Sequence, residues 1–210
     1  GSYTGGIDVA HLTGEMIQPV GHKTGNEQPH ICNGVNAHIE VGETMVYGTD
    51  RGVSFYDRKK KLWTHTLQGK VVLALCKHNG TILAGTYGEG VFAISQDGKS
   101  TQLYCAENKK IATNYVYSLW QDRKGGLWIG CLDGDLVHIA SNGTHRHKIQ
   151  TVQSISDMPD GRVAVCTANG FYAINPQDGT TNYYFSPEEL QGRNINSYVT
   201  GALFTGNNTA

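Results

Sequence analysis

A short glycine-rich element recurs five times along the 210-residue chain and constrains its fold more than any other feature. In each copy a pair of small residues is followed, after a few mostly polar residues, by a glycine and a run of aliphatic or aromatic residues. The copies read GSYTGGIDVA from residue 1, GTDRGVSFY from 48, GTYGEGVFAI from 85, GCLDGDLV from 130 and CTANGFYAI from 166. Successive copies therefore begin 47, 37, 45 and 36 residues apart. Self-similarity at a period of about 20–50 residues is typical of solenoids and propellers.

The unit around residue 85 predicts a meander of four strands. Its runs with strand character cover residues 72–76, 81–86, 90–95 and 100–105. Asn79-Gly80 and Asp97-Gly98 lie between successive runs, and such pairs favour type I′ hairpins, which need positive φ at both central residues. One meander leaves much apolar surface exposed, so neighbouring units must cover each other in a stack or a ring. Four strands per unit favour the ring, and we predict an all-β fold, a β-propeller built of four-stranded antiparallel blades.

The amino-acid composition agrees with a folded β protein and argues against nucleic acid as a partner. The chain has 27 glycines and 5 prolines, as expected for many tight turns, and 39% of its residues are hydrophobic. Its formal net charge is −1, and its Lys and Arg residues are scattered, so we expect no nucleic-acid partner. No run approaches the roughly 20 apolar residues of a transmembrane helix, and the first residues lack the zones of a signal peptide.

The third full unit carries the most specific motif. It has a Val, an aliphatic residue three positions on, an Asp, a Gly turn and a Leu-Trp-Ile-Gly run, at Val116, Leu119, Asp122, Gly125-Gly126 and residues 127–130. This pattern resembles the two-component regulator propeller repeat. The other units keep the Gly turn and the apolar strand after it but lack the tryptophan, and Asp157 is the nearest counterpart of the aspartate.

The resemblance implies a function. Proteins that carry this repeat are extracytoplasmic sensor portions of hybrid two-component histidine kinases of Bacteroides type, which bind oligosaccharides. It therefore implies a non-catalytic, periplasmic ligand-binding module of an inner-membrane protein, with an oligosaccharide ligand and a homodimer formed through the parent protein. The transmembrane helix, histidine kinase and DNA-binding regulator of that family are absent from these residues, so any membrane contact would run through a missing helix.

The repeat boundaries suggest a partial propeller. We expect half a blade at 1–33, repeats at 34–70, 71–115, 116–150 and 151–198, and half a blade at 199–210, all within one propeller domain or fragment. A five-unit ring closed by strands from both termini is the alternative. We favour the fragment because the chain begins within a unit and because the family carries many more repeats.

Candidate ligand-binding residues follow from the topology of a propeller. Functional residues usually lie in the loops between the second and third strands and in the connections between blades, which share one face. Tyr, Asn, Asp and Arg suit sugars, because hydroxyl groups need donors and acceptors and the C–H faces stack on aromatic rings. The candidates are Tyr3, Asp50, Arg51, Tyr87, Glu89, Asn114, Tyr115, Asp133, Asn169, Arg193 and Asn194.

No sequence motif indicates catalysis, a metal or a cofactor. We find no Gly-x-Ser-x-Gly and no His-Glu-x-x-His, and we predict no catalytic residue, no metal ligand and no cofactor. His145 and His147 share one face of an expected outer strand, and we expect both rings to face solvent. The basic run from Arg58 to Lys61 predicts a solvated turn at an outer edge.

Two other classes of function remain open. The first is a small propeller enzyme, either resembling streptogramin lyases or a glycan-active hydrolase or lyase, with Asp133 and Asp135 or Asp50 and Glu89 as its carboxylates. The second is a protein-interaction scaffold. The five cysteines are odd in number and lack metal-ligand spacing, so we expect them to be buried as small hydrophobic residues, and they do not fix the compartment.

Overall fold

The computed structural model describes residues 7–9, 18–20, 34–95, 97–184, 198–202 and 204. In these residues the regular secondary structure is β-strand throughout, in four four-stranded antiparallel sheets and one two-stranded pair. The pair consists of β1 (Ile7–Val9) and β2 (Gln18–Val20). The predicted all-β fold of four-stranded antiparallel blades is confirmed. None of the described residues belongs to a helix that is long and apolar enough to cross a membrane.

The four sheets are blades whose strands pair in sequence order. Blade 1 consists of β3 (Val35–Val41), β4 (Thr44–Thr49), β5 (Gly52–Asp57) and β6 (Leu62–Thr66). Blade 2 consists of β7 (Val72–His78), β8 (Thr81–Thr86), β9 (Val91–Ile94) and β10 (Ser100–Tyr104). Blade 3 consists of β11 (Val116–Gln121), β12 (Leu127–Cys131), β13 (Leu136–Ala140) and β14 (Gly143–His147). Blade 4 consists of β15 (Val152–Asp157), β16 (Val163–Thr167), β17 (Gly170–Ile174) and β18 (Thr181–Tyr184).

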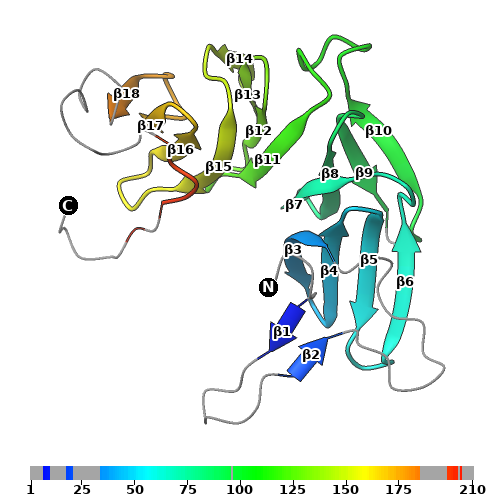
Figure 1. Cartoon of the computed structure of the whole chain (residues 1–210). Coiled ribbons are helices and arrows are strands. Elements are labelled where there is room, and N and C mark those ends of the chain that lie inside the picture. The colour runs from blue at the N-terminus through cyan, green and yellow to red at the C-terminus, as the bar shows by residue number, and fades with distance from the viewer. Residues whose placement is uncertain are drawn as a thin grey trace.

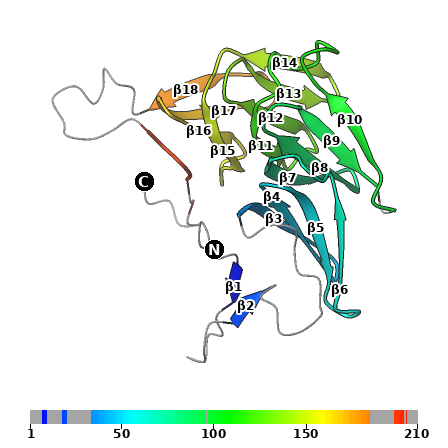
Figure 2. The same ribbon diagram turned by 45° about the vertical axis from the view of Figure 1, so that its right-hand side comes forward.

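The blades follow one another in an arc, as Figures 1 and 2 show from two directions. The first strands of consecutive blades contact each other, β3 with β7, β7 with β11 and β11 with β15. These first strands are therefore the inner strands of the arc, and β6, β10, β14 and β18 form the outer edges of their sheets. This is the arrangement of a partial propeller.

The hydrophobic core lies between the blades. Val46 of blade 1 and Val72 of blade 2 belong to one buried cluster, and Leu83 of blade 2 and Leu127 of blade 3 belong to the next. Trp128 lies with residues of blades 3 and 4 in a third cluster. Because each cluster is completed by the neighbouring blade, burial of apolar surface couples the blades to one another.

One glycine in the second strand controls how closely blades 2 and 3 approach. A Cβ atom at Gly85 would lie 2.7 Å from Cγ1 of Val116 on the next inner strand, closer than packed atoms allow. Gly48 meets Val72 and Gly130 meets Val152 in the same way. Blade 4 has Cys166 at this position instead. The repeated glycine thus makes room for the inner-strand valine of the following blade.

The two predicted hairpin turns differ in backbone conformation. Asn79 and Gly80 have φ values of 48° and 80°, as a type I′ turn requires. At Asp97-Gly98 only the glycine has a positive φ, of 80°, and its N–H donates to the Ser95 carbonyl at 2.9 Å. The second turn is therefore not type I′.

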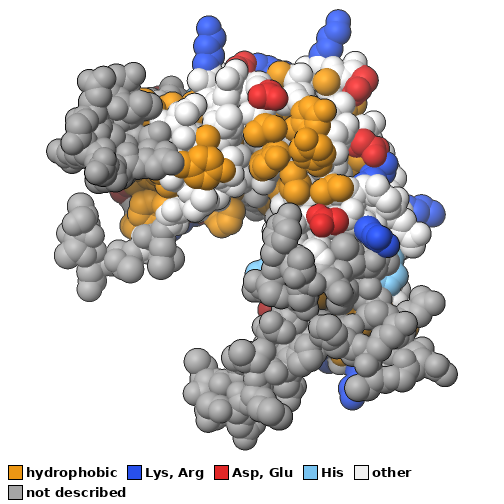
Figure 3. All heavy atoms as spheres, viewed as in Figure 1, with side chains coloured by type: hydrophobic (Ala, Val, Ile, Leu, Met, Phe, Trp, Pro, Cys, Tyr) orange, Lys and Arg blue, Asp and Glu red, His pale blue; other side chains and the backbone are white. Residues whose placement is uncertain are grey.

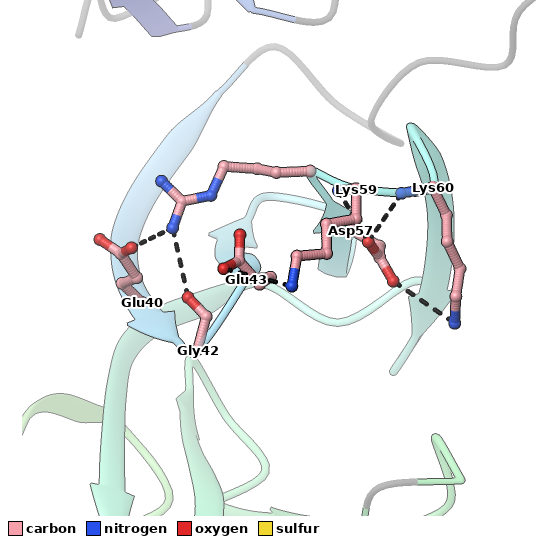
Figure 4. A network of polar contacts seen from close by, with 7 residues as sticks. Glu40, Gly42, Glu43, Asp57, Lys59 and Lys60 are labelled. Atoms are coloured by element: carbon pink, nitrogen blue, oxygen red, sulfur yellow. Dashed lines mark hydrogen bonds and ion pairs between the residues drawn. The ribbon is translucent and has the colours of Figure 1, made fainter.

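The basic run after β5 is held by carboxylates at the end of blade 1. Arg58 pairs with Glu40, and Lys59 Nζ lies 3.6 Å from Glu43 Oε1 (Figure 4). Asp57 Oδ1 accepts from the backbone N–H groups of Lys59 and Lys60 at 3.0 and 2.9 Å. The Lys59 and Lys60 side chains are 73% and 75% exposed, in agreement with a solvated turn.

Candidate functional site

The loop between the second and third strands has the same internal support in three blades. In blade 2 the buried Thr86 hydroxyl donates to the Gly90 carbonyl at 2.8 Å and accepts from the Glu89 N–H at 3.1 Å. Thr49 in blade 1 and Thr167 in blade 4 make the equivalent pair of bonds. Blade 3 carries Cys131 at this position. The hydroxyl groups fix the loop backbone, which leaves the loop side chains to face outward.

Asn114, in the connection between blades 2 and 3, forms hydrogen bonds to the β8–β9 loop. The Asn114 carbonyl accepts from the N–H groups of Gly88 and Gly90, each at 3.0 Å. Its side chain accepts from the Ala106 N–H at 2.8 Å and donates to Glu107 Oε1 at 3.0 Å. Asn114 thereby orders the backbone from which Tyr115 projects.

Four tyrosines gather on this face, and we call Tyr87, Tyr115, Tyr117 and Tyr198 the tyrosine surface. The rings of Tyr87 and Tyr115 have centroids 4.8 Å apart and are inclined by 59°, and Tyr117 meets Tyr87 edge-on at 6.5 Å. Tyr87, Tyr115 and Tyr198 are 50%, 37% and 48% exposed. Figure 3 shows hydrophobic side chains gathered on this face where blades 2 and 3 meet, with acidic side chains around them.

The pKa of the Tyr117 phenol, at the tyrosine surface, is raised. Burial raises the pKa of the Tyr117 phenol, and the neighbouring Tyr87, Tyr198 and Asp133 raise it further. Asp133 lies in the β12–β13 loop and is exposed. The adjacent Leu132 N–H donates to the Tyr115 carbonyl at 3.0 Å, which holds that loop beside the start of β11.

The structure brings together four of the predicted ligand residues and separates others. Tyr87, Asn114, Tyr115 and Asp133 lie at the junction of blades 2 and 3. Glu89 is also in the β8–β9 loop, where it pairs with Lys70. The remaining candidates belong to other places: Asp50 and Arg51 to blade 1, Asn169 to blade 4, and Tyr3, Arg193 and Asn194 to positions outside the described residues.

Two members of the tyrosine surface were not among the predicted residues. Tyr117 lies within β11, two residues after Tyr115, and alternate residues of a strand share a face. Tyr198 precedes Val199 as Tyr115 precedes Val116. Strand alternation and the repeat alignment were the signals that could have found them.

A second polar cluster lies inside blade 3 and contains the Asp and Trp of the recognised motif. Asp122 Oδ2 accepts from Trp128 Nε1 at 2.8 Å, and Asp122 Oδ1 accepts from the Gly126 N–H at 2.9 Å. His138 is buried, with its Nε2 atom 3.3 Å from Asp122 Oδ2. This cluster ties the β11–β12 turn to the middle of the blade.

The expectation that His145 and His147 both face solvent is wrong for His147. Its ring lies 5.6 Å from the Trp128 ring, nearly parallel to it, and its Nε2 atom is buried without a hydrogen-bond partner. Burial lowers the pKa of the His147 imidazole, and His145 lowers it further. The outer strand leans over the tryptophan, so its inward-facing side chain is covered. Among the described residues, no group of three or more His, Cys, Asp or Glu side chains could hold a metal ion.

A groove of about 810 Å³ lies between blades 1 and 2, away from the tyrosine surface. Its walls include apolar side chains such as Val46, Phe55 and Ile82, together with the β9–β10 turn. The Thr66 hydroxyl donates to the Gly98 carbonyl across it at 2.8 Å. The groove contains none of the predicted ligand residues.

Comparison with solved structures identifies the fold. The extracellular domain of the hybrid two-component system BT3049 from B. thetaiotaomicron matches with a TM-score of 0.72 and 21% identity, over 88% of this chain and 26% of that chain. The extracellular domain of the one-component system BT4673 from the same organism matches with a TM-score of 0.64 and 16% identity, over 77% of this chain and 26% of that chain. The chain shares the propeller fold of these extracellular domains. It spans about a quarter of their length.

The same fold also occurs in an enzyme. A gluconolactonase from Xanthomonas campestris matches with a TM-score of 0.54 and 14% identity, over 67% of this chain and 57% of that chain. No family model matches the sequence, and no curated protein matches it. The fold alone therefore does not decide between sensor and enzyme, and function must be argued from the site.

Proposed function

We propose that the chain is a non-catalytic, ligand-binding part of an extracytoplasmic sensor in a two-component system, and that its ligand is an oligosaccharide. The observation that carries the proposal is the tyrosine surface. Three of its rings are more than a third exposed, and they come from the β8–β9 loop, from the segment before β11 and from the segment after blade 4. Exposed aromatic rings of this kind stack on the apolar C–H faces of sugars.

Polar groups at the border complement the rings. Asp133 and the tyrosine hydroxyl groups supply donors and acceptors for sugar hydroxyls. The backbone beneath them is fixed by Thr86 and Asn114, so little order has to be gained when ligand binds. The fold that the chain shares with extracellular domains of two-component systems supports the sensor role.

Signalling would follow from differential binding. In this proposal the parent protein is a periplasmic sensor joined through the inner membrane to a histidine kinase, and it forms a homodimer. Ligand shifts the population towards the dimer arrangement that it binds more tightly. The chain itself contributes recognition and no chemical step.

Calorimetric titration of the chain with a panel of oligosaccharides tests the proposal. At least one glycan should bind to the unmodified chain, and Tyr87→Ala and Tyr115→Ala should each weaken it roughly tenfold, the order expected for losing one stacked ring. Tyr184→Ala is the matched control, because Tyr184 is 39% exposed on β18, outside the tyrosine surface. Failure of every glycan class to bind, or equal effects of all three variants, would reject the proposal.

A further inference from the structure

The tyrosine surface has a carboxylate, that of Asp133, in an adjoining loop, whereas the nearby lysine and arginine side chains contact other groups. Asp133 is exposed and close enough to Tyr117 to act on its phenol. The loop that carries Asp133 is fixed there from two sides. Leu132 bonds to the Tyr115 carbonyl, and a Cβ atom at Gly134 would lie 2.9 Å from Cβ of Ala112 in the connection. The loop on both sides of Asp133 is therefore held against the connection from which Tyr115 projects.

The nearby cations among the described residues are engaged elsewhere. Lys70 pairs with Glu89 and lies 5.3 Å from the centre of the Phe92 ring. Lys110 lies over the ring of Tyr104, also at 5.3 Å. The Arg146 guanidinium donates to the backbone carbonyls of Lys109 and Lys110 at the outer edge of blade 3. Within the described part of the chain, no Lys or Arg side chain therefore forms an ion pair with Asp133.

We propose that Asp133 makes the tyrosine surface selective for neutral oligosaccharides over oligosaccharides that carry carboxylate groups. This inference rests on the proposed function and names the class of ligand for the same site. A carboxylate of a uronic acid placed over the rings would stand a few ångströms from Asp133, and like charges at that distance near a surface repel by an amount worth roughly a three- to tenfold change in affinity. A neutral sugar has no such penalty and can donate its hydroxyl groups to Asp133.

Pairs of ligands that differ only in a carboxylate charge separate the effect of that charge from the effect of the sugar skeleton. The probes are oligogalacturonides and glucuronic acid-substituted xylo-oligosaccharides, each compared with its methyl ester, which keeps the skeleton and removes the charge. For each skeleton that binds, the ester should bind the unmodified chain about threefold or more tightly than the acid at low salt. The preference should shrink at about 1 M salt, where the Debye length is about 3 Å.

Asp133→Asn should remove most of the preference, and Glu43→Gln should leave it unchanged. Glu43→Gln is the matched control, because it removes one negative charge, as Asp133→Asn does, but in the β3–β4 turn, where Glu43 pairs with Lys59. A second measurement does not depend on ligand. In NMR spectra of chain labelled with ¹³C at tyrosine Cζ, the pKa of Tyr117 should fall in Asp133→Asn and not in Glu43→Gln.

The outcomes separate the two proposals. Binding of neutral and acidic probes with a ratio that Asp133→Asn does not change overturns the selectivity and leaves the oligosaccharide site standing. An unchanged Tyr117 pKa in Asp133→Asn also overturns it. Absence of binding by every probe, neutral ones included, overturns the proposed function and the selectivity with it.

Discussion

The indole ring of Trp128 stacks face to face on the imidazole ring of His138, with centroids 3.9 Å apart and planes inclined by 8°. The same indole donates its N–H to Asp122, and His138 Nε2 lies 3.3 Å from the same carboxylate oxygen. A histidine that is 3% exposed is thus held between an aromatic face and a buried carboxylate. Blade 3 is therefore the blade whose stability should respond most to protonation.

The free energy of unfolding should fall as the pH is lowered from about 7 to about 5. Burial lowers the pKa of His138 below its ordinary 6.5, against the opposing effect of Asp122, and burial also lowers that of His147. A histidine with a depressed folded-state pKa binds its proton more readily in the unfolded chain, so stability is full above the unfolded pKa and is lost as pH falls below it. Each such histidine contributes a slope of at most about 1.4 kcal/mol per pH unit.

Urea unfolding at several pH values measures this slope. His138→Gln should reduce the slope, while His38→Gln should change it little, because His38 is exposed on β3 in blade 1, outside this cluster. Among the described residues, the pKa values of five carboxylates are lowered, so their contributions to stability are lost only at lower pH. They are Asp57, Asp97, Glu107, Asp160 and Asp178. A flat profile between pH 7 and pH 5 would contradict the prediction.

Asp122→Ala should destabilise the chain by roughly 3–5 kcal/mol. The substitution removes the acceptor of the Trp128 indole N–H and of the Gly126 backbone N–H, both of which are buried. Buried donors left without a partner cost about 1–3 kcal/mol each. Asp157→Ala is the control, because Asp157 at the end of β15 pairs at 3.7 Å with Arg123, which is 61% exposed. In blade 4 the place of Asp122 itself is taken by Met158, and Asp157 aligns with Gln121. Equal losses for the two variants in urea unfolding would show that the buried network is not the cause.

The sequence predicted the blades well because their determinants are local. Alternation of apolar residues, the Asn79-Gly80 turn and the repeated glycines depend on neighbours only a few residues away. The sequence could not tell that Gly85 makes room for Val116, because that contact joins different blades. The conformation of the Asp97-Gly98 turn also escaped prediction, since the dipeptide is compatible with more than one hairpin type.

The candidate site was predicted only in part, for a related reason. Topology assigned Tyr87 and Tyr115 to one face from their places in the repeat, and the two rings are in contact. Tyr117 was overlooked because a residue inside a strand is usually assigned to the core. The burial of His147 depends on how the outer strand lies over Trp128, which no local pattern encodes.

Gly85→Ala should destabilise the chain by about 1–3 kcal/mol, the usual cost of overpacking a well-filled core. The new methyl group would meet Cγ1 of Val116 at 2.7 Å, so one of the two blades must shift. A double-mutant cycle with Val116→Ala tests the cause, because the smaller side chain removes the clash. The Gly85→Ala substitution should cost less in the Val116→Ala background than in the unmodified chain. Additive losses in thermal or urea unfolding would contradict the proposed packing.

Thr86→Val should cost about 1–2 kcal/mol. It keeps the shape of the side chain but deprives the Glu89 N–H of its acceptor and removes the bond to the Gly90 carbonyl. Cys131→Val is the matched control, because Cys131 occupies the same place in blade 3 without a hydroxyl group, and it should change stability by less than about 1 kcal/mol. If the two substitutions cost the same, the threonine hydroxyl is not what supports the loop.

The described cysteines should resist alkylation in the folded chain. Cys76, Cys105, Cys131 and Cys166 are all free and buried. Burial raises the pKa of the Cys76 thiol to about 11 and that of the Cys131 thiol to about 12. Since the thiolate is the nucleophile, both low access and a high pKa slow the reaction.

Mass spectrometry after a short exposure to iodoacetamide, read cysteine by cysteine, measures this protection. The four thiols should remain unmodified at neutral pH in the folded chain and become fully labelled in urea. Raising the pH to about 9 should produce little labelling of Cys76 and Cys131, because their pKa values lie well above it. Rapid modification of Cys131 at neutral pH would mean that the junction of blades 2 and 3 opens, since Cys131 is 1% exposed and belongs to the cluster between those blades. Protection of all four would instead explain how free thiols persist in a chain whose proposed location is outside the cytoplasm.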